Sequence, residues 1–181
     1  EQFKLSIRRP SAEQDITKFP AIRFSETDST VSIIGSNFHA VVNKATGYLS
    51  DYVFKNRHLI QSDLMPHFWR APLDNDLGNL MHIRTAVWKN IGKELTVQYF
   101  QRSLANNVAK IKVITEHKVT GSKITMTYQI YGNGLIDIHL QLKTGNKRLP
   151  ELLIKKLKIL MVEKKKSLKY QHNLCLQLIP N

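Results

Sequence analysis

The feature that most constrains the fold is a series of segments in which apolar and polar residues alternate. Three such segments follow one another, at residues 111–119, 124–130 and 136–142. Short runs of Gly, Asn, Ser and Thr separate them, and another such run, Thr144-Gly-Asn146, follows the last segment. Because successive side chains of a strand point to opposite faces, each segment predicts a strand with one buried face. The short turns predict that these strands form an antiparallel meander.

The first half of the chain repeats this pattern with shorter segments. Residues 30–34 and 38–42 flank Gly35-Ser36-Asn37, which is a hairpin signal. A third strand is expected at residues 48–54, and two helical turns at residues 82–90 with Gly92 as their stop. No alternation of strands and helices and no repeat of solenoid length occurs. We therefore predict a mainly β chain that folds as an antiparallel β-sandwich.

Composition narrows the class of protein. A chain of 181 residues with 42% hydrophobic and 23% charged residues can bury a core and form one well-packed domain. It has no run of about 18 apolar residues, and it does not begin with a signal or transit peptide. The single cysteine, Cys175, excludes an internal disulfide and a cysteine-based zinc site. The single cysteine is compatible with the cytoplasm, and a periplasmic location stays open.

A net charge of +13 raises the question of nucleic-acid binding. Ten Lys or Arg residues and two Glu lie between Lys143 and the end, so +8 of that charge is in the last 39 residues. The other 142 residues carry only +5 and show no recognition helix, zinc finger or RNA-binding signature. This distribution favours a solvated basic tail over a nucleic-acid binder.

The stretch Pro66 to Gly78, PHFWRAPLDNDLG, is the strongest candidate for a functional site. Asp74 and Asp76 could form an acid pair for glycoside hydrolysis if they lie about 5–10 Å apart, as residues i and i+2 of an extended segment do. A structural network with Arg70 is the favoured alternative, because such carboxylates often cap turns or pair with a nearby arginine. A calcium loop is disfavoured, since a third ligand and a distal Glu are missing.

Other catalytic arrangements have weaker support. The seven histidines are scattered, and no strained serine nucleophile turn occurs. His117 and His139 fall within predicted strands, where a hydrogen-bonded or solvent-facing imidazole is the favoured interpretation. Phe68, Trp69 and Trp88 could stack on a sugar, but core packing is favoured for at least two of the three.

The eleven residues FWRAPLDNDLG, at positions 68–78, resemble the F-x-R-A-P-x-D-N-D-x-G signature of the β-galactosidases of glycoside hydrolase family 2. In that family the signature opens the carboxy-terminal small-chain domain, a β-sandwich of the galactose-mutarotase-like (supersandwich) type. Residues 42–49 resemble an early hairpin of that domain, and residues 86–88 resemble a short helical segment after the signature. Residues 1–5 resemble the last strand of the immunoglobulin-like domain that precedes it.

The resemblance implies three parts of the chain. Residues 1–20 are expected to be the end of the preceding immunoglobulin-like domain and a linker. Residues 21–151 are expected to be the amino-terminal part of the small-chain sandwich, which makes that sandwich truncated. Residues 152–181 lack the family's W-x-G-x-G-P-x-E-N-Y motif, and we expect them to be an atypical lysine-rich tail of non-homologous origin.

The resemblance also implies a function. The chain is expected to be a fragment of a retaining β-galactosidase that hydrolyses terminal non-reducing β-D-galactosides. In the family, the catalytic glutamates and the Mg²⁺ and Na⁺ ligands lie in a TIM barrel. We therefore expect no catalytic and no metal-binding residue in this chain, and no activity from the chain alone. Asp74 and Asp76 should then not be the catalytic pair.

The motif is instead expected to brace a loop that partly lines the active-site rim. The loop and its anchor comprise Arg70, Asp74, Asn75, Asp76, Gly78 and Asn79. Expected partners are the galactoside bound to the full-length enzyme and the TIM barrel of the same enzyme. The full-length enzyme is expected to be a homo-oligomer. No nucleic-acid or membrane partner is expected. The alternative is an independent carbohydrate-binding β-sandwich module.

Overall fold

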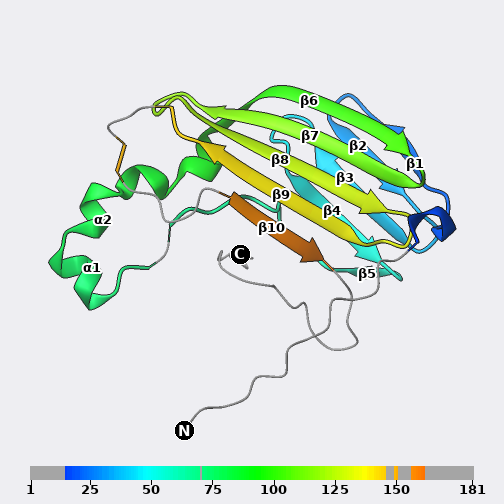
Figure 1. Cartoon of the computed structure of the whole chain (residues 1–181), viewed down its shortest axis with the longest axis horizontal. Coiled ribbons are helices and arrows are strands. Elements are labelled where there is room, and N and C mark those ends of the chain that lie inside the picture. Colours follow the sequence, from blue (N-terminus) through cyan, green and yellow to red (C-terminus); the bar gives the residue numbers. More distant parts are fainter. Residues whose placement is uncertain (1–14, 70, 146–148, 151–155, 162–181) are drawn as a thin grey trace, which may run out of the picture.

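The computed structural model describes residues 15–69, 71–145, 149–150 and 156–161. These residues form two antiparallel sheets of five strands each (Figure 1). In the first sheet the strand order is β1-β2-β3-β4-β5, and in the second it is β10-β9-β8-β7-β6. Each sheet is therefore a meander in which sequence neighbours pair.

The strands of the first sheet are β1 (Arg23–Glu26), β2 (Thr30–Ile34), β3 (Phe38–Asn43), β4 (Leu49–Phe54) and β5 (Arg57–His58). Those of the second sheet are β6 (Leu95–Ala105), β7 (Val108–His117), β8 (Ser122–Tyr131), β9 (Ile136–Lys143) and β10 (Lys156–Met161). Short helices precede and connect the sheets: η1 (Ile16–Lys18), α1 (Asp74–Gly78), α2 (Met81–Arg84), η2 (Ala86–Trp88) and η3 (Ile91–Glu94).

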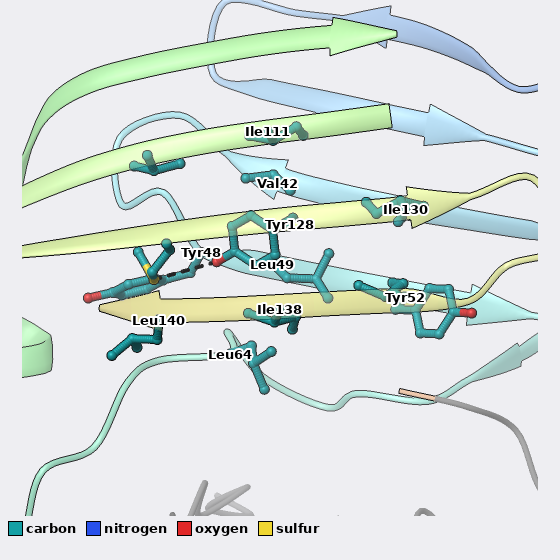
Figure 2. Packing of buried hydrophobic residues seen from close by; sticks show 14 of the residues in the cluster. Val42, Tyr48, Leu49, Tyr52, Leu64, Ile111, Tyr128, Ile130, Ile138 and Leu140 are labelled. Carbon is teal, nitrogen blue, oxygen red and sulfur yellow. Dashed lines mark hydrogen bonds between the residues drawn. The ribbon is translucent and has the colours of Figure 1, made fainter. Parts of the chain in front are cut away.

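The two sheets pack face to face around one hydrophobic core. Alternate residues of β3, β7 and β8 are buried, as the period of a strand requires. Figure 2 shows core side chains from the two sheets lying against one another, including Val42, Leu49, Ile111 and Tyr128. The prediction of an antiparallel β-sandwich is confirmed. Its assignment to the galactose-mutarotase-like type stays a prediction.

Three tyrosines fasten parts of the fold that are distant in sequence. The Tyr128 hydroxyl in β8 donates a 2.9 Å hydrogen bond to the Gly47 carbonyl oxygen, in the turn between β3 and β4. The Tyr52 hydroxyl in β4 donates to the Gly134 carbonyl oxygen, in the turn between β8 and β9. The Tyr48 hydroxyl donates to the Gly92 carbonyl oxygen. Each bond satisfies a phenol that is buried in an apolar core.

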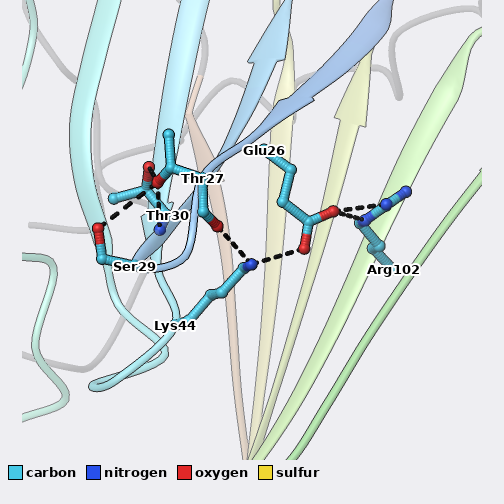
Figure 3. Close-up of polar contacts among 6 residues, drawn as sticks. All are labelled: Glu26, Thr27, Ser29, Thr30, Lys44 and Arg102. Carbon is cyan, nitrogen blue, oxygen red and sulfur yellow. Dashed lines mark hydrogen bonds and ion pairs between the residues drawn. The ribbon is translucent and has the colours of Figure 1, made fainter.

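An ion-pair network joins the two sheets at one side of the sandwich (Figure 3). Glu26 of β1 accepts a 2.7 Å hydrogen bond from Arg102 Nε of β6, and its other oxygen lies 2.6 Å from Lys44 Nζ. Lys44 Nζ also donates to the Thr27 carbonyl oxygen. The hydrogen bonds from Lys44 and Arg102 lower the pKa of the Glu26 carboxyl. The guanidinium lies over the Phe24 ring, 5.0 Å from its centroid.

The structure corrects two predictions from sequence, and two more fall wholly or partly outside the described residues. The helix expected at residues 82–90 is broken into short pieces, and Gly92 lies inside η3 instead of ending a helix. Strands β1, β5 and β6 are not predicted by the alternation of residues. The preceding-domain strand expected at residues 1–5 lies outside the described part of the chain. Of the expected atypical tail, only β10 is described, and its origin stays a prediction.

Candidate functional site

The motif at residues 66–78 leads into helix α1, whose five residues read DNDLG. Leu73, just before the helix, has an extended backbone (φ −92°, ψ 171°), and its N–H donates a 2.8 Å hydrogen bond to Asp76 Oδ2. Asp76 thus provides half of a capping box by satisfying a backbone donor at the helix start. Asp74 and Asp76 both lie in the first turn, where negative charge is favoured by the helix dipole.

This geometry corrects one premise about the acid pair. The sequence interpretation places Asp74 and Asp76 on an extended segment, where their carboxylates would share a side. In a helix, residues i and i+2 are rotated by about 200° around the axis, so these two carboxylates do not face a common point. Asp74 is exposed, and Asp76 is used in capping. The extended arrangement that the acid-pair interpretation assumed is therefore replaced by a helical one.

The other predicted site residues lie on the same short helical segment, except for one. Asn75, Gly78 and Asn79 are exposed. The Asn75 carbonyl oxygen accepts from the Asn79 N–H at 3.2 Å, and the Asn79 carbonyl oxygen accepts from Arg84 Nη1 at 2.6 Å. Arg70, the expected anchor, lies outside the described residues. The structure therefore brings Asp74, Asn75, Asp76, Gly78 and Asn79 together in α1 and its carboxy-terminal cap.

Leu80 links α1 to α2 in an unusual conformation. Its φ of 58° lies in the left-handed region, which is costly for a residue with a branched side chain. The Leu80 carbonyl oxygen accepts hydrogen bonds from Ile83 and Arg84, which fix the start of α2. Sequence patterns do not signal a left-handed leucine, because glycine or asparagine is the usual residue there.

The α1–α2 segment also carries apolar side chains that the described part of the chain leaves in solvent. Leu73 is 66% exposed, Leu77 48%, Leu80 57% and Ile83 64%. We call these four residues the exposed apolar segment. Together they account for most of the large exposed hydrophobic residues of the described chain. Exposed apolar residues concentrated in this way are typical of contact surfaces.

The amino-acid sequence carries a signal for this feature. The four residues recur at intervals of four, three and three positions, which is the spacing of one helical face. The turn-like composition of DNDLGN hides this periodicity, because Asp, Asn and Gly favour loops.

The aromatic residues near the motif are mostly part of the core. Trp88 is 1% exposed, and Phe68 packs against the buried cluster. Trp69 is partly buried, and its backbone N–H donates to His67 Nδ1 at 3.3 Å. The preference for core packing over sugar stacking is confirmed for Trp88 and Phe68.

A hydroxyl, an imidazole and a carboxylate meet elsewhere, at His117. Its Nδ1 lies 2.9 Å from Thr120 Oγ1 and its Nε2 lies 2.8 Å from Glu94 Oε2. His117 and Thr120 are only 2% and 3% exposed, and Thr120 Oγ1 also accepts from the Ser122 N–H. The Thr120 hydroxyl is too enclosed to reach a substrate. The cluster instead joins η3 to the β7–β8 turn. The expectation of a hydrogen-bonded His117 is confirmed, although the sequence does not reveal its partners.

Two further observations concern classes of function. Within the described ranges, no group of three or more His, Cys, Asp or Glu side chains could hold a metal ion. Among those same residues, no helix has the length and hydrophobicity to cross a membrane.

Comparison with known proteins identifies proteins that are related to this chain. The sequence profile of the family described as "Beta galactosidase small chain" matches residues 34–167. A β-galactosidase of Priestia megaterium is 28% identical over 156 residues, which are 84% of this chain and 14% of that protein. A β-galactosidase of Pseudoalteromonas haloplanktis is 36% identical over 81 residues, 43% of this chain and 8% of that protein. The β-galactosidase small subunit of Latilactobacillus sakei is 23% identical over 106 residues, 56% of this chain and 33% of that protein.

Proposed function

Because the chain belongs to the β-galactosidase small-chain family, we propose that it is a supporting part of an enzyme that hydrolyses terminal non-reducing β-D-galactosides. It corresponds to only 14% of the length of the Priestia megaterium relative. In this proposal the catalytic glutamates belong to the TIM barrel of the same enzyme, and this chain alone is inactive. The sugar meets the chain only in the assembled active site.

The observation that carries this proposal is the exposed apolar segment, which begins within the family motif and extends past it. Leu73, Leu77, Leu80 and Ile83 project from a short helix pair that the core of the sandwich does not cover. Burying a leucine side chain contributes about 1.5–3 kcal/mol, so covering several of them would hold two domains together firmly. The barrel of the same enzyme is the proposed partner, and α1 with its Asp76 cap would brace the active-site rim.

We propose that the metal ions of the full-length enzyme also bind to the barrel. This is consistent with the described residues, among which no group of three or more His, Cys, Asp or Glu side chains could hold a metal ion. We place both ions of the full-length enzyme, which we take to be a homo-oligomer, outside this chain. Nucleic acid and membrane have no part in the proposed function.

A chimeric enzyme tests the proposal. The 156 aligned residues of the Priestia megaterium relative are replaced by those of this chain, and hydrolysis of a chromogenic β-galactoside is measured for the chimera and for the chain alone. We expect turnover by the chimera and none by the chain. Leu77→Lys should reduce turnover by the chimera at least about tenfold, because it places a charge in the apolar contact.

Ser36→Lys is the matched control, because it adds the same charge at an exposed turn far from α1 in sequence. It should leave turnover unchanged. A folded but inactive parent chimera, or equal activity of the Leu77→Lys and Ser36→Lys chimeras, would contradict the proposed role. Turnover by the chain alone that Asp74→Ala abolishes would overturn the assignment of catalysis to the barrel.

Calorimetry separates this proposal from an independent carbohydrate-binding module. Galactose or lactose titrated into the chain alone should give at most weak binding, because the barrel wall of the site is absent. Tight binding by the isolated chain would favour the module.

A further inference from the structure

Helices α1, α2 and η2 belong to one loop whose two ends meet at the sandwich. Just before this loop the chain still runs along β4, because the Leu64 N–H donates a 2.8 Å hydrogen bond to the Leu49 carbonyl oxygen. At the end of the loop, Ile91 of η3 is back in the core and is 1% exposed. We call the segment between Pro66 and Gly92 the helical loop. Figure 1 shows its helices α1 and α2 at one end of the sandwich, beyond the two sheets.

Gly92 allows the two ends of the helical loop to meet because it has no side chain. It is buried in η3, and a Cβ at this position would overlap the Pro66 carbonyl oxygen and lie 2.8 Å from Met65 Cγ. A backbone oxygen cannot move aside without moving the start of the loop. In a helical turn alanine is ordinarily favoured over glycine, so the close approach to Pro66 accounts for the glycine.

The Tyr48 hydroxyl holds the same point from the side of the sandwich. It donates to the Gly92 carbonyl oxygen, and only 5% of the tyrosine is exposed. Tyr48 directly precedes β4, whose first residue, Leu49, accepts the hydrogen bond from Leu64. The two ends of the helical loop are therefore fixed to adjacent residues at the start of β4.

We propose that Tyr48 and Gly92 are positioning residues that determine where the helical loop lies relative to the sandwich. The loop carries all four side chains of the exposed apolar segment, so a displacement at its base moves them together. Where that segment meets the barrel, such a displacement would misplace the active-site rim, and this step rests on the proposed function. A misplacement of about 1 Å can reduce turnover by up to about a hundredfold.

Tryptophan fluorescence of the full 181-residue chain tests the positioning without the rest of the enzyme. The chain has two tryptophans, Trp69 and Trp88, and both lie in the helical loop. Under native conditions, Tyr48→Phe should shift the emission to longer wavelength and increase quenching by acrylamide, because the loop opens more often. Gly92→Ala should have the larger effect, because it forces the two ends apart.

Two substitutions on the opposite side of the core are matched controls. The Tyr52 hydroxyl also donates to a glycine carbonyl oxygen, that of Gly134, and Tyr52 is 3% exposed. A Cβ at Gly132 would also overlap a proline carbonyl oxygen, that of Pro20. Figure 2 shows Tyr48 and Tyr52 on opposite sides of the core that it draws. Tyr52→Phe and Gly132→Ala should lower thermal stability as the loop variants do, but leave the tryptophan emission unchanged.

The chimeric enzyme tests the effect on the reaction. In an active chimera, Gly92→Ala should lower kcat/KM for the chromogenic β-galactoside at least about tenfold relative to Gly132→Ala. Tyr48→Phe should lower it relative to Tyr52→Phe. Circular dichroism shows which variants keep the fold, and if Gly92→Ala does not, the two tyrosine variants decide.

The outcomes separate this inference from the proposed function. Equal fluorescence of the Tyr48→Phe and Tyr52→Phe chains would overturn the positioning role, whatever the chimera does. Equal kcat/KM of these two variants in an active chimera would overturn its effect on the reaction and leave the proposed function intact. A parent chimera that folds without turnover would instead contradict the proposed function, and the fluorescence comparison would still decide whether Tyr48 and Gly92 position the loop.

Discussion

The hydroxyl of Tyr128, in β8, donates a 2.9 Å hydrogen bond to the carbonyl oxygen of Gly47, in the turn between β3 and β4 of the opposite sheet. Both partners are buried, and they lie 81 positions apart in the chain. The bond therefore joins the two layers of the sandwich inside its core. It sets the position of the β3–β4 turn relative to the second sheet.

Tyr128→Phe should destabilise the chain by about 1–3 kcal/mol, because the Gly47 carbonyl oxygen would stay buried without its donor. Urea unfolding followed by fluorescence or circular dichroism measures this change. Tyr99→Phe is the control, since the Tyr99 hydroxyl donates to the Gln101 side chain at the exposed surface. Equal effects of the two substitutions would show that the inter-sheet bond adds nothing.

Alkaline pH should destabilise the sandwich through the same tyrosines. Burial raises the pKa of the Tyr128 and Tyr48 hydroxyls above the ordinary value of 10.0. The unfolded chain then loses these protons before the folded chain does, so their contribution to stability is constant below about pH 10 and falls as pH rises further. Urea midpoints measured from pH 8 upward check this, and those of Tyr128→Phe should fall less steeply. A flat profile would contradict the assignment.

Two glycines should respond to alanine in opposite ways. Gly47 has a φ of +75°, and a Cβ there would lie 2.5 Å from Val113 Cγ1, so Gly47→Ala should destabilise by about 1–3 kcal/mol. A Cβ at Gly78 would meet nothing within 4 Å, and Gly78→Ala should be neutral or stabilise by up to about 1 kcal/mol. Thermal unfolding of both variants measures the difference. A large loss at Gly78 would mean that the motif glycine is needed for folding.

Asp76→Ala should loosen α1 while leaving the sandwich intact. The substitution removes the acceptor of the Leu73 N–H, which should cost about 1 kcal/mol at the helix start. Hydrogen exchange should therefore speed up in residues 74–84 and stay unchanged in β7 and β8. Asp74→Ala, at an exposed position of the same helix, should change exchange less. Uniform acceleration across both sheets would show that Asp76 supports the core.

His117→Ala should be costly, because it removes a buried ring that joins Glu94 to Thr120. We expect a loss of about 2–4 kcal/mol from the cavity and from the Thr120 hydroxyl left with one partner fewer. His139→Ala is the matched control, since His139 is also a histidine within a strand of the second sheet but is only partly buried. Urea unfolding should separate the stabilities of the two variants by more than about 1 kcal/mol.

The strands of the meander are predictable because their two faces differ. In β7, β8 and β9 the apolar residues alternate with polar ones, and Gly-rich turns mark their ends, so local sequence carries the whole signal. Strand β6 lacks that signal, since exposure on both faces of its second half removes the alternation. It is a strand because it pairs with β7, and its own residues do not reveal that pairing.

The motif stands out in the sequence as a candidate site, but its shape cannot be predicted from its residues. Asp, Asn and Gly suggest a loop at residues 74–79, yet Asp76 caps a helix there and Leu80 turns the chain into α2. Both features depend on backbone hydrogen bonds that only coordinates show. The Glu94–His117 contact could not be predicted from sequence patterns either. It joins residues 23 positions apart, which the packing of η3 on the second sheet brings together.

The ion pair between Glu26 and Arg102 has a consequence for how the chain folds. Each sheet is a meander of hairpins between sequence neighbours, so each can assemble from interactions of short range in sequence. Glu26 and Arg102 are 76 positions apart, and their bond requires both sheets to be in place. The ion pair therefore forms only when the two sheets have come together, and we expect it to break early in unfolding because it lies at the exposed side of the sandwich. Protonating Glu26 in acid would then speed unfolding while the folding rate stays the same.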